Sequence, residues 1–171
     1  MELFETIQNR FSCRAFSDTP VENEKIKKIL DAINLAPSAG NKQAYKIAVV
    51  RSEITKKDLA YASHEQTFIE KAPYLLVFLA DQKASSVKYA ERGESLYCIQ
   101  DATLAAAYAQ LVATALGLAT CWIGAFDPLE VSRVVRAKAF QIPIAIIPIG
   151  YPEEAPKEKI RKSLANLIYE A

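Results

Sequence analysis

The sequence predicts an α+β fold, in which helices flank a central mixed or antiparallel sheet. Short apolar segments alternate with amphipathic ones, but without the regular strand–helix–strand order of a parallel sheet. A nearly continuous apolar segment, about residues 95–116, is too long for a strand and predicts a long helix buried on several sides. Neither a repeat nor a low-complexity tract divides the chain, so we expect one domain over residues 1–171.

The first half of the chain is predicted to begin with a short helix over residues 2–9. An amphipathic helix over 23–35 follows, because Ile26, Ile29, Leu30 and Ile33 recur at steps of three and four. The run Pro37–Asn41 contains strong helix breakers and ends it. The next predicted elements, in order, are a strand over 46–50, a helix over 53–62, a helical turn over 65–71, and a strand over 74–80.

The strand over 74–80 is continuously apolar, which is typical of a central strand buried on both faces. Residues 81–94 are polar, and we expect a mobile segment there. Gly117 is placed to cap the long helix, and a strand over 119–124 should follow. The pair Asp127-Pro128 has N-cap and first-turn chemistry and predicts a helix to about residue 137. A last strand over 144–149 precedes a cationic tail, residues 153–162, and a short apolar segment, residues 164–169.

The composition excludes several classes of protein. A net charge of +1 argues against a nucleic-acid binder that relies on a general basic surface. Asp101 and Gln110 interrupt the longest apolar segment, which argues against a membrane span. His64 is the only histidine and is expected in a surface loop, so we expect no metal site. The three cysteines, an odd number without CxxC spacing, indicate reduced, buried thiols. No secretion signal is visible at the start, and we expect a cytoplasmic protein.

The segment Arg10–Arg14 carries the first candidate site. In an extended chain Arg10, Ser12 and Arg14 share one face, while Phe11 and Cys13 share the other. Arginine forks and a hydroxyl suit a phosphate, and the apolar pair can anchor the segment to a core. From this segment alone, a short amphipathic linker with solvated arginines explains the pattern equally well.

Two other stretches could complete an anion site. The five glycines are too far apart for a GxGxxG or Walker loop, so side chains must hold any phosphate. Besides the Arg10–Arg14 segment, Arg161 and Lys162 are available as donors. The loop over residues 37–43 offers amides that donate and accept at once, as the edge of a flavin or a base requires. Loops that end helices often have this composition for structural reasons alone.

Four blocks of sequence are informative when they are taken together and in this order: Arg10–Phe16 (RFSCRAF), Ala36–Gln43 (APSAGNKQ), Gly117–Gly124 (GLATCWIG) and Ile149–Pro152 (IGYP). Together they resemble the nitroreductase family of FMN-dependent oxidoreductases. The resemblance extends from residue 3 to about residue 165. It implies a nitroreductase-like α+β fold and an obligate homodimer with two FMN sites at the subunit interface.

The resemblance also implies roles for individual residues. Arg10 and Ser12, with Arg161 from the tail, would hold the FMN phosphate. Arg14 would lie nearer the ribityl chain and the pyrimidine side of the ring, where it stabilises reduced flavin. Ser38 and Ala39, with Pro37 beside them, would form a wall supplied by the second subunit. Asn41 and Gln43 would contact the ring or the ribityl chain. The Ile123–Gly124 backbone would lie near N5.

The implied activity is a ping-pong reaction without a catalytic side chain. NADH or NADPH reduces FMN at N5, and a small-molecule acceptor such as a nitroaromatic or a quinone then takes the electrons.

Two departures from the family pattern stand out. Ala44-Tyr45 replaces a common Pro-Trp pair, and the segment 81–94 is too short for a helical insertion, which suggests an open site. The alternatives are a flavin- or nucleotide-binding module without turnover, and a specialised relative such as a dehalogenase or a flavin-cleaving enzyme.

Overall fold

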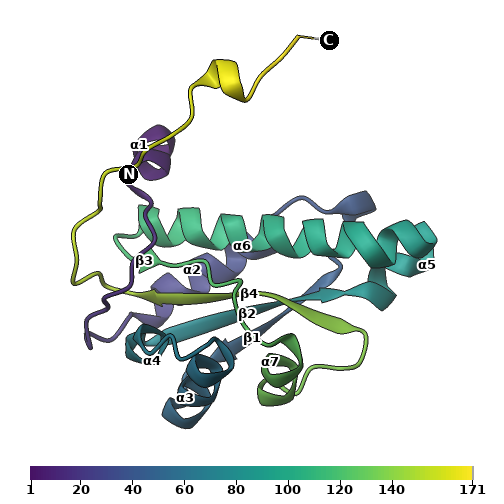
Figure 1. Ribbon diagram of the computed structural model, residues 1–171, viewed down its shortest axis with the longest axis horizontal. Helices are drawn as coiled ribbons and strands as arrows, with labels where there is room; N and C mark the ends of the chain where they lie inside the picture. Colours follow the sequence, from purple (N-terminus) through teal and green to yellow (C-terminus); the bar gives the residue numbers. More distant parts are fainter. Residues whose placement is uncertain (171) are drawn as a thin grey trace.

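The computed structural model describes residues 1–170 and contains a four-stranded sheet in the order β1-β2-β4-β3 (Figure 1). The predicted single domain 1–171 also includes Ala171, which lies outside the described residues. The strands are β1 (Tyr45–Val50), β2 (Tyr74–Asp81), β3 (Ala119–Thr120) and β4 (Gln141–Gly150). All three neighbouring pairs of strands are antiparallel. The sequence predicts a mixed or an antiparallel sheet, and the structure shows an antiparallel one.

Helices cover both faces of this sheet. They are α1 (Leu3–Asn9), α2 (Asn23–Asn34), α3 (Glu53–Ala62), α4 (Phe68–Lys71), α5 (Gln82–Arg92), α6 (Cys98–Ala115) and α7 (Pro128–Val134). Short helical turns lie at η1 (Ala39–Asn41), η2 (Gly93–Tyr97) and η3 (Leu164–Asn166). Figure 1 shows α2 and α6 on one face, with α3, α4 and α7 on the other. The α+β prediction is therefore confirmed.

Strand β2 separates two hydrophobic cores. All of its eight residues are buried, as its continuous apolar sequence predicts. Because side chains alternate along a strand, Leu76 and Phe78 enter the core beneath α2 and α6, whereas Leu75 and Val77 enter the core beneath α3 and α7. The strand is thus the central element on which both layers of helices pack.

The alanine-rich face of α6 belongs to the chain's own core. Ala102, Ala105, Ala106 and Ala109 are fully buried and pack in the cluster shared with α2 and the sheet. The sequence left open whether this face covers a second subunit, and the structure assigns it to the same chain. The polar residues of α6 are also paired, since Gln110 donates to Thr120 Oγ1 at 3.2 Å. None of the helices in residues 1–170 is long and apolar enough to cross a bilayer.

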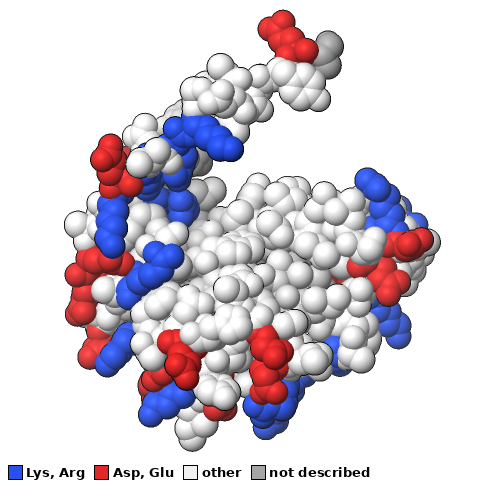
Figure 2. Space-filling model, viewed as in Figure 1, with Lys and Arg blue, Asp and Glu red and all other residues white. Residues whose placement is uncertain are grey.

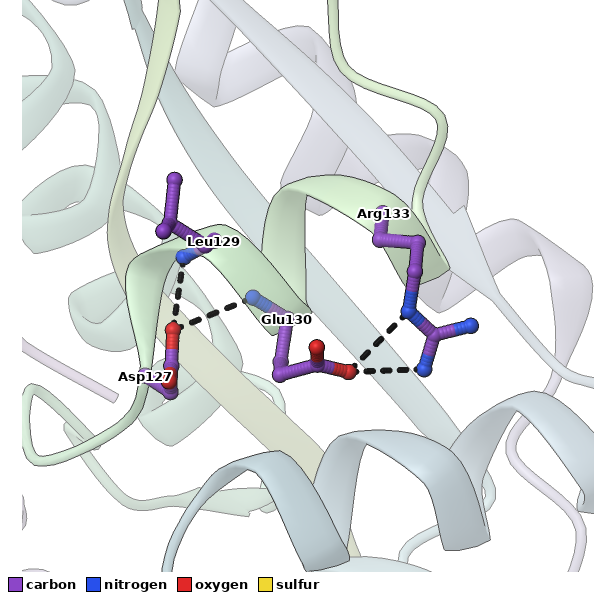
Figure 3. A network of polar contacts seen from close by, with 4 residues as sticks. All are labelled: Asp127, Leu129, Glu130 and Arg133. Atoms are coloured by element: carbon purple, nitrogen blue, oxygen red, sulfur yellow. Dashed lines mark hydrogen bonds and ion pairs between the residues drawn. The ribbon is translucent and has the colours of Figure 1, made fainter.

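Helix α7 begins with the cap that its sequence predicts. Asp127 Oδ1 accepts hydrogen bonds from the backbone N–H groups of Leu129 at 2.8 Å and Glu130 at 3.1 Å (Figure 3). Glu130 then pairs with Arg133 one turn later, at 2.7 Å. The helix ends at Val134, three residues before the predicted end, and Arg136 takes a left-handed conformation with a φ of 55°.

Two segments differ from the sequence prediction. The strand expected over 119–124 spans only Ala119–Thr120; after two residues outside the sheet, Ile123 returns as an isolated bridge to Ile146. The segment 81–94, expected to be mobile, is mostly helix α5. Its polarity reflects an exposed helix at the end of α6 and not a missing structure. The open site inferred from the shortness of this segment stays a prediction.

The last residues form a C-terminal arm, residues 153–170. It runs past the N-terminal segment and α1 and then projects from the rest of the molecule (Figure 1). Its first part is held by backbone and side-chain bonds: the Glu153 N–H donates to the Ala15 carbonyl at 2.9 Å, and Glu154 Oε1 accepts from the Arg14 N–H. Its apolar side chains are exposed: Ile160, Leu164, Leu167, Ile168 and Tyr169.

Candidate functional site

The Arg10–Arg14 segment lies extended beside β3. Ser12 forms a parallel bridge with Thr120, and the Cys13 N–H donates to the Thr120 carbonyl at 3.0 Å. Cys13 is buried, whereas Ser12 and Arg14 are exposed on the opposite side. This is the alternation that the sequence suggests, although Arg10 and Phe11 are each half-buried. The segment therefore presents a polar face to solvent and is anchored by its apolar one.

The thiols beneath this face are shielded. Burial raises the pKa of Cys13 to about 11, and it also raises the pKa of Cys121. The charge of Arg14 and a hydrogen bond from Ser12 oppose the rise in the pKa of Cys121. All three cysteines are buried and free, so they serve as core residues here.

A second part of the same site comes from the C-terminal arm. Lys159 Nζ donates to the Gln8 carbonyl at the end of α1. Partial burial lowers the pKa of Lys159, and the nearby charges of Arg10 and Arg161 lower it further. Lys159 contacts Gln8, two residues before Arg10, and Arg161 follows Lys159 by two residues, so the three cations lie in one region. None of them forms an ion pair with a carboxylate of residues 1–170. We refer to these three side chains as the cation cluster.

The cation cluster is a site that favours a dianion. Three like charges held together repel one another, so a phosphate placed among them relieves the repulsion and accepts several charge-assisted hydrogen bonds. Beside it lies a small cavity of about 220 Å³, which is lined by Phe11, Ser12, Arg14, Glu154, Ala155 and Lys157. The structure brings Arg10, Ser12, Arg14 and Arg161 to one region. Lys162 is exposed further along the arm.

The loop over residues 37–44 is held from below by Asp101. This carboxylate is only 1% exposed, and it accepts from the Ala39 N–H at 2.8 Å and from the Ala44 N–H at 3.2 Å. Within the loop, Ser38 Oγ accepts from the Gln43 N–H at 2.9 Å. One buried acid in α6 thus fixes both ends of the loop, which shapes the wall of a neighbouring cavity.

Two predicted loop residues are placed differently from Ser38. Gln43 Nε2 donates to the carbonyl and the side-chain oxygen of Asn34, both at 3.0 Å, so this amide ties the loop to α2. Asn41 is exposed at the turn, with a φ of 57°. Gln43 and Asn41 also both lie in left-handed conformations, which asparagine tolerates more easily than glutamine. In this chain Gln43 is therefore engaged in shaping the loop.

The cavity beside this loop has a volume of about 550 Å³. Its lining comes from the loop and the first turns of α6: Pro37, Ser38, Ala39, Tyr97, Ile99, Gln100, Asp101, Thr103 and Leu104. Most of these groups are apolar, so the cavity suits a flat ring. We refer to it as the loop cavity.

The loop that borders the loop cavity is tied to the first turn of α6, whereas α1 and β3 lie near the other end of this helix (Figure 1). Asp101 marks the loop end, and Gln110, which bonds to Thr120 beside Ser12, marks a point about 14 Å further along the helix. The Ile123–Gly124 backbone lies on the β3 side, with Ile123 buried and Gly124 exposed. In one chain, the predicted site residues therefore form two separate groups.

Comparison with known proteins assigns this architecture. The family model described as the nitroreductase family matches residues 7–92 and 60–151 in two overlapping segments. The chain belongs to the nitroreductase family. An FMN reductase [NAD(P)H] of Bacillus subtilis is 27% identical over 173 residues, which cover 94% of this chain and 70% of that protein. An NADH dehydrogenase of Thermus thermophilus is 29% identical over 186 residues, which cover 93% and 91% of the two chains.

A solved structure supports the same assignment. An FMN-dependent nitroreductase of Clostridium difficile R20291 superposes with a TM-score of 0.79 at 28% identity, covering 95% of this chain and 93% of that one. The nitroreductase-like fold expected from the four blocks is therefore confirmed.

Two site residues escaped the sequence analysis. Lys159 was only one cation of a basic tail, and nothing local showed that the arm turns back to α1. Asp101 was noted as a polar interruption of an apolar helix, and that signal was the useful one. A buried carboxylate requires hydrogen-bond donors. Here the donors are backbone N–H groups of the helix-breaking loop, at Ala39 and Ala44.

Proposed function

We propose that this nitroreductase-family protein is an FMN-dependent NAD(P)H oxidoreductase that reduces nitroaromatics, quinones or a related acceptor. The observation that carries the proposal is the contact of Lys159 with Gln8, which brings the cations of the arm to the end of α1 beside Arg10. The cation cluster of Arg10, Lys159 and Arg161 has no ion pair within residues 1–170, so its charges suit the FMN phosphate. When bound, FMN supplies the two-electron chemistry that links a nicotinamide donor to the acceptor. Two of the relatives, an FMN reductase and an NADH dehydrogenase, support the same cofactor and donor.

Each group of the site then has one task. The cation cluster and the Ser12 hydroxyl would bind the phosphate, and Arg14 would reach past it towards the ribityl chain and the pyrimidine edge. A cation at that edge favours the reduced, anionic cofactor and raises its potential. Gly124 is exposed and would offer its backbone groups beside the ring, whereas both backbone groups of Ile123 are bonded to Ile146, at 3.1 and 3.0 Å. No side chain of this chain is needed as an acid, a base or a nucleophile.

We propose further that two copies share each site. The Pro37–Ala39 wall and the cation cluster occupy different parts of one chain, so a second copy related by a two-fold axis would bring the wall of one chain to the cations of the other. Leu104 and Tyr108 on the outer face of α6 are 39% and 38% exposed. Figure 2 shows a broad area without charged side chains over this helix, which suits an interface between copies.

The C-terminal arm supports the same assembly. Its apolar side chains, among them Ile160 at 89% exposure, lack cover within residues 1–170. An arm that projects from its own subunit can gain this cover on the second copy, while its cations remain at the site.

The three buried, free cysteines also suit a reducing compartment such as the cytoplasm.

The test begins with the purified wild-type chain. We expect a yellow protein that binds FMN and consumes NADH or NADPH when a quinone such as menadione is supplied. Sedimentation should give twice the 18.9 kDa mass of the chain. FMN binding without donor consumption would identify a non-catalytic flavin-binding module. A chain that stays monomeric while retaining FMN would contradict the shared site.

A further inference from the structure

Helix α5 and the start of α6 form a tight corner over the loop cavity. The chain reverses at Ala90, whose φ of 48° and ψ of −136° are rarely adopted by residues other than glycine. Behind the turn, a Cβ on Gly93 would lie 2.6 Å from the Ser85 carbonyl oxygen, so the two arms of the corner touch through their backbones. Strain of this kind persists only where the surrounding packing fixes the conformation, and the corner is therefore a rigid feature.

The corner presents two aromatic rings, each carrying a cation. Tyr89 and Tyr97 meet edge to face, with ring centroids 5.0 Å apart. Lys88 Nζ lies 5.1 Å from the centroid of Tyr89, and the Arg92 guanidinium carbon lies 5.4 Å from that of Tyr97. Arg92 Nε also donates to the Tyr97 hydroxyl at 2.9 Å, which leaves the two terminal nitrogens of its guanidinium free to bind a ligand.

Acidic side chains lie near these cations but form no ion pair with them. Glu91 and Glu94 lie on the same exposed segment, but neither Lys88 nor Arg92 has a carboxylate oxygen within ion-pair distance in the part of the chain that the structure describes. Figure 2 shows lysine and arginine side chains, with acidic ones beside them, gathered at the α5 end of the molecule. Two exposed cations held on aromatic rings form a receptor for an anion.

The corner also borders the loop cavity. Tyr97 lines that cavity together with Pro37 and Leu104. On the loop side, a Cβ on Gly40 would lie 2.2 Å from the Tyr89 hydroxyl and 2.6 Å from Lys88 Nζ, so both tips rest on the loop. An apolar cavity for a ring and two cations at its rim thus lie side by side, far from the cation cluster at the other end of α6.

We propose that Lys88 and Arg92 bind the phosphates of the nicotinamide dinucleotide donor, while its reduced ring enters the loop cavity beside Tyr97 and lies against the FMN ring that the Pro37–Ala39 wall would border. This inference rests on the proposed function, because it assigns the donor of that reaction to a place on the chain. A flat ring linked to phosphates matches an apolar cavity with a cationic rim. Neutral acceptors such as quinones have no group for these cations, so the corner acts on the donor step alone.

The test compares the FMN-loaded wild type with Lys88→Gln/Arg92→Gln. The matched control is Lys27→Gln/Arg133→Gln, which removes one exposed lysine and one exposed arginine from α2 and α7. Calorimetry with the unreactive 1,4,5,6-tetrahydro forms of NADH and NADPH measures donor binding without turnover. We expect Kd to rise about tenfold in the corner variant and to stay unchanged in the control. The wild-type Kd should also rise with salt more steeply than that of the corner variant.

Steady-state kinetics separate the phosphates from the ring. KM for the dinucleotide should rise, whereas KM for menadione and for a neutral dihydronicotinamide without phosphates should stay constant. Weaker binding of both analogues would assign the cations to the pyrophosphate, and weaker binding of the NADPH analogue alone would assign them to its 2′-phosphate. Unchanged Kd for both analogues would overturn the inference, as would an equal rise in KM for the neutral donor. A wild type without FMN binding or turnover would instead refute the proposed function.

Discussion

Replacing Asp101 with asparagine tests how the loop cavity is built. The buried carboxylate accepts the Ala39 N–H at 2.8 Å and the Ala44 N–H at 3.2 Å, one on each oxygen. An asparagine of the same shape has one accepting oxygen and one donating amino group. Whichever way the amide is turned, one loop N–H keeps an acceptor and the other faces a second donor.

The expected cost follows from this geometry. The variant loses one charge-assisted hydrogen bond, which contributes about 1.5–3 kcal/mol, and leaves a buried donor without a partner. We expect the free energy of unfolding to fall by about 3 kcal/mol. For a chain of this length, that corresponds to a decrease in Tm of roughly 6–12 °C.

The measurement is thermal unfolding of the FMN-free protein at fixed concentration, with Asp31→Asn as the control. Asp31 pairs with Lys27 at 2.7 Å on the exposed face of α2, so its replacement should change stability by less than about 0.5 kcal/mol. Hydrogen exchange at the Ala39 and Ala44 amides should accelerate only in the Asp101 variant. Equal Tm values and equal exchange in the two variants would refute the assignment of Asp101 as the support of the loop.

Three further predictions concern the rest of the chain. Arg10→Ala and Lys159→Ala should each weaken FMN binding about tenfold to a hundredfold, measured by fluorescence titration of the cofactor-free chain; an unchanged Kd in both would exclude the cation cluster as the phosphate site. Gly93→Ala should lower the free energy of unfolding in urea by about 1–3 kcal/mol, because the new Cβ would meet the Ser85 carbonyl at 2.6 Å, although alanine favours helix; a stabilised variant would show that the corner can relax. Because burial raises the pKa of Cys13 from 9.0 to about 11, the folded chain keeps a proton that the unfolded chain loses. The free energy of unfolding should therefore fall as the pH rises from about 9 to 11, and urea titrations of Cys13→Ala should show a weaker dependence on pH.

The main elements of the fold could be predicted from the sequence because their signals are local. The amphipathic spacing of α2, the continuous apolar run of β2 and the Asp127-Pro128 start of α7 each depend on residues a few positions apart. The polar segment 81–94 was misjudged for the same reason. Its polarity is local, whereas the packing of Gly93 against Ser85 that fixes the corner depends on a chain reversal.

The candidate site divides along the same line. The sequence by itself determined the alternation of Arg10, Ser12 and Arg14, since an extended backbone alone places them on one face. Only the tertiary structure decided that Lys159 reaches the end of α1 beside Arg10, more than 140 residues away. It also decided that Asp101 holds the loop through Ala39 and Ala44, which precede it by 62 and 57 residues. Such pairs carry no local signal, because charge and hydrogen-bonding groups act over a few ångströms of space whatever their separation along the chain.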